Sequence, residues 1–345
     1  MRQRWITRWI FGCGVGGVAV GLLSQAAVCA EPADVLVDTA NAAHMQNFQG
    51  VLIYRDSERL EALRVVHRYK DGNESERVTS LNGEPREVFR VNDRVYCILP
   101  KDRMMRLQRP PLKGFLNQLT PDRVRELSAW YDFKSLGMQR VAARSCVGVA
   151  VVPRDGYRFG YEVWSDVQTH IPLKFSLVDS AGRVREQVMF TEVDFPANIP
   201  DDAFKTEVNT AKYQVVTRDE PESLLPMEPV AGGDPNLIFG AMPPGFRPVI
   251  HDQGHLPGGS VEVQHTLITD GLSAISIFSH TNQGNIHYGF VGASHMGSVE
   301  AYDRLIGSLH VTVVGEAPAA TLKMIGDGVQ PARTLVDDKS RPDRP

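Results

Sequence analysis

The sequence predicts a mainly antiparallel β protein of the α+β class, with one large and one small domain. Short apolar stretches alternate with polar residues at a period of two, which is typical of strands with one buried face. Turn-forming pairs such as Asn82-Gly83 and Asp155-Gly156 separate these stretches closely enough for antiparallel hairpins. A few segments have helical spacing instead, and an acidic, proline-rich segment divides the 345 residues.

The large domain is expected to open with a helix, because Ala33, Leu36, Val37, Ala40 and Ala43 repeat at helical spacing. Alternating segments then indicate strands, and one stretch returns to helical spacing. The predicted strands are Leu63–Tyr69, Val95–Leu99, Ile171–Leu177 and Val184–Phe190, and the second helix is Pro121–Tyr131.

The small domain has the same alternation over shorter stretches. One segment, Val299–Ile306, fits a helix and a strand equally well, and Pro318–Ile325 is expected to close the domain as a helix. The predicted strands are Val261–Leu267, Ala274–Phe278, Ile286–Val291 and His310–Val314.

The N-terminal residues have the pattern of a cleavable secretory signal. Three arginines precede an uncharged apolar stretch, and Val28-Cys29-Ala30 fits the cleavage rule. No other stretch approaches the about 18 apolar residues that a membrane span needs. The predicted parts are a signal (1–30), a large domain (31–216), a linker (217–235), a small domain (236–325) and a disordered tail (326–345).

The overall charge argues against a nucleic-acid partner. The chain has 37 Lys and Arg against 41 Asp and Glu, a formal net charge of −4. Loss of the three signal arginines would make the exported chain still more acidic. No basic field therefore exists at the level of the whole chain.

Cysteine usage indicates an oxidising compartment. Cys97 and Cys146 are the two cysteines that remain once the signal is removed, and two cysteines in an exported chain favour one disulfide. The alternative is two buried thiols. Neither cysteine belongs to a CxxC pair, so thiol redox catalysis and a zinc ribbon are not supported.

No motif predicts an enzyme, a metal site or a cofactor. Ser294 lies in a segment that resembles a nucleophile elbow, but Met296 occupies the place of its second glycine. His251 and His255 have a spacing that could hold a metal on a helix, yet the glycines and proline around them favour a loop. A hydrolase using these residues is therefore a minor alternative to a binding protein.

Two segments suit binding. A stretch of five positive residues could contact phosphate or another anionic group, although a solvated hairpin edge is the plainer interpretation. An aromatic face on neighbouring strands could line an apolar ligand cavity, or could be ordinary core. The candidate anion contacts are Lys101, Arg103, Arg106, Arg109 and Lys113, and the candidate cavity residues are Tyr54, Tyr157, Phe159, Tyr161 and Phe175.

Several motifs together resemble one family. The most specific runs from Pro153 through Asp155, Tyr157-Arg158-Phe159-Gly160-Tyr161, Trp164, Asp166 and Thr169 to Pro172-Leu173-Lys174. Further matches are Met45, Phe48, Gly50, Tyr54, Glu84, Arg86-Glu87, Pro243-Pro244-Gly245-Phe246, Asp270-Gly271-Leu272, Ser276, Phe278 and Val311–Pro318. This set resembles the MucB/RseB family of periplasmic sigma-factor regulators.

The resemblance implies a fold and a function. The large domain would be an unclosed β-barrel capped by helices, similar to LolA and LolB, followed by a smaller α+β domain. The protein would bind the periplasmic segment of an RseA/MucA-type anti-sigma factor, shield it from regulated proteolysis, sense lipopolysaccharide or another acylated molecule, and self-associate. A periplasmic lipid or lipoprotein carrier of the LolA/LolB type is the alternative function.

Overall fold

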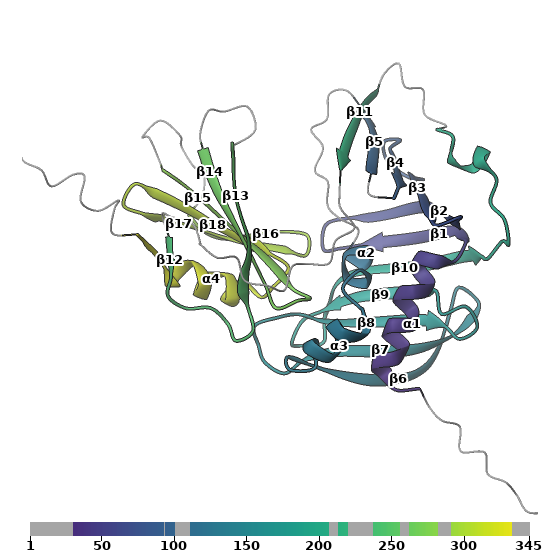
Figure 1. The fold of residues 1–345 in the computed structure, drawn as a ribbon, viewed down its shortest axis with the longest axis horizontal. Coiled ribbons are helices and arrows are strands. Elements are labelled where there is room, and N and C mark those ends of the chain that lie inside the picture. Colours follow the sequence, from purple (N-terminus) through teal and green to yellow (C-terminus); the bar gives the residue numbers. More distant parts are fainter. Residues whose placement is uncertain are drawn as a thin grey trace, which may run out of the picture. The chain divides into compact units, whose positions relative to one another are not determined.

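The structure is a computed structural model. It describes residues 30–92, 94–100, 111–206, 213–219, 237–255, 262–281 and 291–332. Residues Glu31–Pro345 form one compact unit that contains two main antiparallel sheets (Figure 1). The residues of the predicted secretory signal lie outside the described part, except Ala30. None of the helices in the described part is long and apolar enough to cross a membrane.

Within the described residues, the first sheet has eleven strands in the order β11-β5-β4-β3-β2-β1-β10-β9-β8-β7-β6. Because β11 and β6 end this order, the sheet does not close, which confirms the predicted unclosed antiparallel architecture. Its strands are β1 (Phe48–Arg55), β2 (Leu60–Lys70), β3 (Asn73–Ser80), β4 (Glu87–Val91), β5 (Arg94–Pro100), β6 (Tyr131–Val141), β7 (Arg144–Pro153), β8 (Gly160–Asp166), β9 (Pro172–Val178), β10 (Val184–Asp194) and β11 (Tyr213–Asp219).

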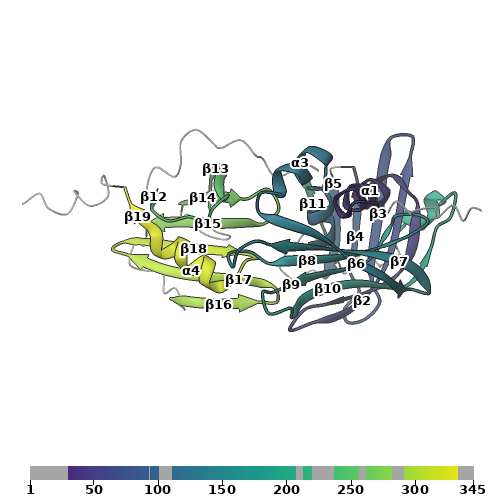
Figure 2. The same ribbon diagram turned by 90° about the horizontal axis from the view of Figure 1, so that it is seen from below.

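Three helices cover one face of this sheet, namely α1 (Pro32–Met45), α2 (Pro111–Leu116) and α3 (Pro121–Leu127). Figures 1 and 2 show α1 and α3 on the same side of β6 to β9. Apolar residues of the helices, including Leu36 and Leu127, form one core cluster with residues of β7, β8 and β9. The helices therefore bury the apolar face that the period-two pattern predicts. A short 3₁₀ helix, η1 (Asp201–Phe204), follows β10.

The second predicted helix is shorter in the structure than in the sequence analysis. Thr120 caps α3 by accepting a hydrogen bond from the Arg123 amide at 3.3 Å, and the helix ends at Leu127. Tyr131 already begins strand β6, where its side chain is fully buried. The apolar residue that extended the helical pattern thus belongs to the sheet.

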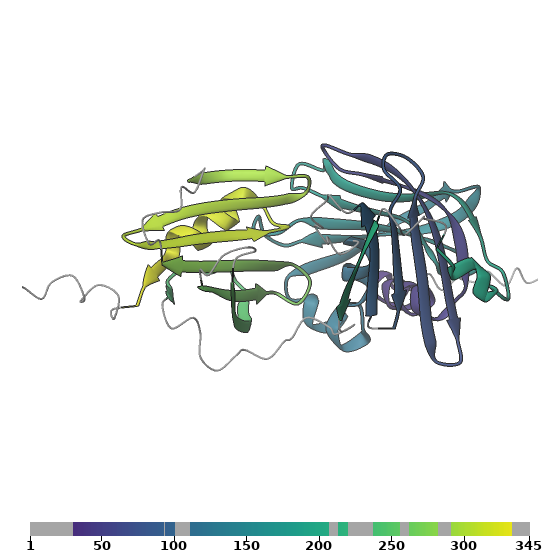
Figure 3. The ribbon, with the colours of Figure 1, turned by 90° about the horizontal axis from the view of Figure 1, so that it is seen from above.

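In the part of the chain that the structure describes, the second sheet has six strands in the order β13-β14-β15-β18-β17-β16. Helix α4 (Ala319–Gly328) packs on one face through Leu322 and Ile325 (Figure 3). The strands are β13 (Arg247–His255), β14 (Glu262–Thr269), β15 (Ala274–Thr281), β16 (Gly292–Met296), β17 (Val299–Ile306) and β18 (Leu309–Gly315), while β12 (Leu237–Phe239) pairs with β19 (Val329–Pro331).

Three segments predicted in the small domain can be compared with the structure. The ambiguous segment Val299–Ile306 is a strand, β17, and the closing helix is present as α4. The strand predicted over Ile286–Val291 lies outside the described residues except for Val291, which is in no strand.

Two predicted boundaries differ from the observed elements. Strand β11 runs to Asp219, three residues into the predicted linker, because Thr217–Asp219 pair with Arg94–Tyr96 of β5. The predicted tail begins inside α4, and Val329 is only 1% exposed in β19. Burial of this one apolar side chain and pairing with β12 give order to a segment whose composition is otherwise polar.

Candidate functional site

Three of the five candidate cavity residues lie together under helix α2. Phe159, Tyr161 and Phe175 are 4%, 6% and 1% exposed. Phe115 of α2 packs against two of them, with its ring centroid 4.7 Å from that of Tyr161 and 5.2 Å from that of Phe175. We call Phe115, Phe159, Tyr161 and Phe175 the aromatic cluster. In the structure it is packed core, with α2 as its cover.

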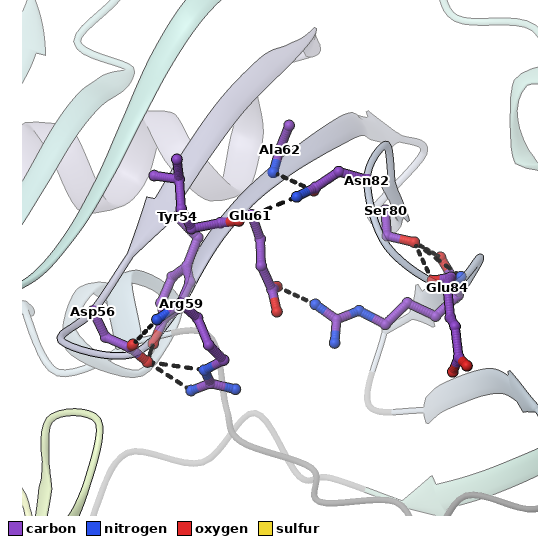
Figure 4. A network of polar contacts seen from close by, with 10 residues as sticks. Tyr54, Asp56, Arg59, Glu61, Ala62, Ser80, Asn82 and Glu84 are labelled. Carbon is purple, nitrogen blue, oxygen red and sulfur yellow. Dashed lines mark hydrogen bonds and ion pairs between the residues drawn. The ribbon is translucent and has the colours of Figure 1, made fainter.

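Tyr54 lies outside the aromatic cluster, in a polar network at the end of β1 (Figure 4). Its hydroxyl donates to Asp56 Oδ2 at 3.1 Å, and the Arg59 guanidinium donates to the same oxygen at 2.7 Å. Burial, followed by the charge of Glu186, raises the pKa of Tyr54. Burial alone would raise the pKa of Asp56, but hydrogen bonds from Glu58 and Arg59 hold it below its usual value.

The same network extends to the next two strands (Figure 4). Asn82 accepts from the Ala62 amide at 2.8 Å, and Ser80 donates to the Glu84 carbonyl at 3.0 Å. Glu61 and Arg86 form an ion pair beside them. These contacts fix the turn that connects β3 to β4 and join it to β2.

The side chains of the five predicted anion contacts lie outside the described part of the structure. Lys101, Arg103, Arg106 and Arg109 lie outside the described residues. Lys113 belongs to α2, two residues before Phe115, and its side chain is outside the described part. A headgroup role for these five residues stays a prediction.

The two cysteines are buried thiols in the structure and do not form the predicted disulfide. Cys97 is on β5 and Cys146 is on β7, and both are 0% exposed. In the strand order, β4, β3, β2, β1, β10, β9 and β8 stand between their strands. Counting cysteines in an exported chain predicts a pairing, but it contains no information on which strands become neighbours.

A buried arginine joins the two sheets. The Arg158 side chain is fully buried, its Nε lies 3.3 Å from Asp270 Oδ2, and its guanidinium donates to the Pro244 carbonyl at 2.6 Å. The guanidinium carbon lies 5.4 Å from the Trp130 ring centroid and 5.0 Å from that of Phe246. We call this group the Arg158 junction, in which aromatic faces and a carboxylate compensate a buried charge.

Asp270 is held from both sides of the Arg158 junction. Tyr131 of β6 donates its hydroxyl to Asp270 Oδ2 at 2.9 Å. The amides of Leu272 and Ser273 donate to Asp270 Oδ1, which shapes the turn between β14 and β15. Burial raises the pKa of Asp270, while Arg158 opposes that effect. Leu272 then packs into the core cluster of the first sheet, so this turn is anchored there.

A second contact joins the sheets through two carboxyl groups. Ser298 of the β16–β17 turn lies 2.5 Å from Glu186 Oε2 of β10 and 3.3 Å from Glu316 Oε1, just after β18. Burial and the charge of Glu316 raise the pKa of Glu186 to about 7. Beside this group, Arg185 and Glu300 form an ion pair at 2.6 Å.

Tyr157 contributes to the same region through its backbone. Its carbonyl accepts a hydrogen bond from the Thr321 hydroxyl of α4 at 3.0 Å. Tyr157 is half-buried and is not part of the aromatic cluster. The predicted shared face is therefore split, because the segment before Gly160 is a bend and not a continuation of β8.

The residues considered for catalysis lie on two different strands, and His251 has a structural partner. The segment with His251 and His255 is strand β13 rather than a loop, and His251 Nδ1 lies 3.1 Å from the Thr266 hydroxyl. Ser294 is exposed on the edge strand β16. Across the described ranges, no group of three or more His, Cys, Asp or Glu side chains could hold a metal ion.

Sequence reasoning missed the Arg158 junction and the contact of Ser298 with Glu186. Arg158 and Asp270 stand in motifs that resemble the family, but their pairing over 112 positions leaves no periodic signal. The usable signal is an arginine inside the aromatic run Tyr157–Tyr161, because such a charge must find a partner when the run is buried.

Known proteins are similar to this chain over residues of both sheets. Sequence models of the MucB/RseB N-terminal domain and the MucB/RseB C-terminal domain match residues 31–208 and 233–330. The sigma factor AlgU regulatory protein MucB of Pseudomonas aeruginosa is 29% identical over 313 residues, which cover 88% of this chain and 92% of that protein.

Two crystal structures have the same fold. MucB in complex with MucA(peri) has a TM-score of 0.67 and 27% identity, over 87% of this chain and 99% of that chain. MucB alone has a TM-score of 0.58 and 26% identity, over 87% of this chain and 98% of that chain. Since the two domain models together match most of the chain, this protein belongs to the MucB/RseB family.

Proposed function

We propose that this protein is a periplasmic negative regulator of an extracytoplasmic-function sigma factor of the sigma-E/AlgU type. It acts by binding the periplasmic segment of an RseA/MucA-type anti-sigma factor. One observation carries the proposal: the structure is similar over both sheets to MucB in complex with MucA(peri), with a TM-score of 0.67. MucB alone, with a TM-score of 0.58 over 87% of this chain, has the same fold.

A binding measurement tests the partner. The purified protein is titrated into the periplasmic segment of the anti-sigma factor from the same bacterium, and the heat of binding is measured by calorimetry. We expect saturable binding that a scrambled peptide of the same composition does not reproduce. Absence of heat and of co-elution with the authentic segment would remove this function and favour the carrier alternative.

Shielding of the anti-sigma factor is the second part of the proposal. A bound regulator covers the segment that the initiating protease must reach, so cleavage should slow as the regulator is added. The measurement is the initial cleavage rate of the anti-sigma segment by that protease at increasing regulator concentration. A rate that stays constant at saturating regulator would limit the function to binding.

An acylated signal is the third part. The aromatic cluster offers apolar surface of the right chemistry, and each buried methylene contributes about 0.8 kcal/mol. Because Phe115 covers Tyr161 and Phe175, an acyl chain must displace α2 to enter. We expect Phe115→Ala to increase the affinity for a fluorescent acyl probe, whereas Leu127→Ala on α3 should not. Equal affinities for both variants and the unmodified protein would exclude this entry route.

The headgroup assignment has a separate test. Arg103, Arg106 and Arg109 changed together to Ser should weaken lipopolysaccharide binding and lessen its salt dependence, because phosphate contacts by arginine are charge-assisted. An unchanged affinity and salt dependence would remove these residues from the site and leave the apolar route untouched.

A further inference from the structure

Glu186, Ser298 and Glu316 form a small polar group between the two sheets, which we call the acid bridge. Glu186 is 1% exposed and Ser298 is 3% exposed. One hydroxyl, Ser298 Oγ, lies within hydrogen-bond distance of a carboxyl oxygen on each side, at 2.5 Å and 3.3 Å. The first contact comes from β10 of the first sheet, and the second comes from the residue after β18 of the second sheet.

When both carboxyl groups are ionised, the acid bridge has one proton too few for two hydrogen bonds at Ser298. A serine hydroxyl has one proton and can donate to one acceptor at a time, whereas an ionised carboxylate only accepts. Two hydrogen bonds at Ser298 Oγ therefore require a second proton, carried by Glu186 or Glu316. With that proton present, one carboxyl donates to Ser298 and Ser298 donates to the other.

The charged neighbours of the acid bridge do not neutralise it. Burial and then Glu316 raise the pKa of Glu186 to about 7, and Asp56 adds to this effect, while Ser298 and Tyr54 oppose it. Burial raises the pKa of Glu316 as well. The nearby cations have acidic partners of their own, because Arg185 pairs with Glu300, Arg59 with Asp56 and Arg158 with Asp270. Tyr161 of β8 also faces the two glutamates and Asp270.

The turn that carries Ser298 is seated closely against the first sheet. Gly297 has a φ of +64°, and a Cβ there would lie 2.8 Å from Asp56 Oδ2. The Gly297 carbonyl is 3.5 Å from the Ser57 hydroxyl. Ser298 of the acid bridge therefore lies next to a contact between the β1–β2 turn and the β16–β17 turn.

We propose that one proton shared within the acid bridge fastens the β16–β17 turn to the first sheet, and that loss of this proton loosens this contact. The sign follows from the direction of the shift. We call the β16–β17 turn closed when it contacts the first sheet and open when it does not. A carboxyl group whose pKa is raised in the closed state stabilises the closed state fully at acidic pH, and this stabilisation disappears as the pH rises through about 7. For a shift from 4.5 to about 7, the ratio of open to closed turn rises at most about 30-fold between pH 5.5 and 8.5.

Hydrogen exchange of the purified protein, without any partner, tests the acid bridge. Exchange in peptides covering the β16–β17 turn is compared between the unmodified protein and Glu186→Gln at each pH, which cancels the intrinsic pH dependence of exchange. Glutamine is neutral at every pH and keeps a donor for Ser298. As the pH rises from 5.5 to 8.5, we expect the exchange rate of this turn in the unmodified protein to increase relative to the rate in Glu186→Gln. The relative increase should be at most about 30-fold.

Two further variants keep the test decisive. Glu192→Gln, an exposed change on the same strand, should exchange like the unmodified protein. Ser298→Ala should lose protection at pH 5.5 and match the unmodified protein at pH 8.5. A pH-independent ratio with Glu186→Gln, or full protection of Ser298→Ala at pH 5.5, overturns the inference. Because no anti-sigma segment is present, that result would leave the proposed function unaffected.

Discussion

Arg158 and Asp270 form an ion pair whose two side chains are both 0% exposed, although they lie in connections of different sheets, between β7 and β8 and between β14 and β15. We expect Arg158→Met to lower the free energy of unfolding by about 3–5 kcal/mol, since it leaves a buried carboxylate without its cation. The measurement is the denaturation midpoint at an unchanged slope.

The control is Arg154→Met, four residues earlier, where Arg154 pairs with Asp132 at 2.9 Å and both side chains are about half exposed. This exposed pair should contribute about 0–1 kcal/mol. A second change, Asp270→Asn in the Arg158→Met background, should recover part of the loss, because it removes the unpaired charge and keeps an oxygen acceptor at this position. Equal effects of Arg154→Met and Arg158→Met would contradict the role of the buried pair.

His280 and His310 predict a loss of stability in acid. Their ring centroids are 5.0 Å apart, and burial lowers the pKa of both, with His310 lowering that of His280 further and Asp303 partly opposing the effect at His310. A lowered pKa means that the folded state favours the neutral ring. Stability from this source is complete above the unfolded pKa of about 6.5 and falls as the pH drops below it.

This dependence runs opposite to that of Glu186, so variants must separate the two. The free energy of unfolding is measured from pH 7.5 to 5 for His310→Gln and for His295→Gln, an exposed change on β16. We expect His310→Gln to flatten the acid side of the profile and His295→Gln to leave it unchanged. Parallel profiles for all three proteins would refute the assignment.

The structure predicts two slowly reacting thiols. Burial raises the pKa of Cys146 to about 11, and Cys97 is 0% exposed, so neither thiol should be alkylated quickly in the folded protein. After unfolding without reductant, mass spectrometry should find two alkylated cysteines at these positions. Zero alkylated cysteines would restore the disulfide that the sequence favoured.

Local patterns predicted most elements of the fold. The helix over Ala33–Ala43 and the strand around Phe175 are readable because each has one face against the same core. The Arg158 and Asp270 pairing is not readable, since it depends on how two sheets meet and not on any repeat. The aromatic residues Tyr54 and Phe175 have similar chemistry in the sequence, yet one lies in a polar network and the other in core.

The β6–β7 hairpin is a further case that the sequence obscures. Its two-residue loop is Ala142-Ala143, between the paired residues Val141 and Arg144, with φ of +47° and +63°. Such loops favour Asn-Gly, so the Ala-Ala pair shows no turn signal in the sequence. Alanine at positive φ costs about 1–2 kcal/mol per residue. The pairing of β6 with β7 compensates that cost.

Ala143→Gly should therefore stabilise the protein. Glycine adopts positive φ without a Cβ clash, but it also increases the entropy of the unfolded chain, so we expect a net gain of about 0.5–1 kcal/mol. The measurement is the denaturation midpoint, and the matched control is Ala150→Gly within β7, where the backbone is extended. There the same change should destabilise by about 1–2 kcal/mol, because glycine adds entropy to the unfolded state and the buried Ala150 methyl group is lost. If both substitutions destabilise equally, the loop does not store the strain that its φ angles imply.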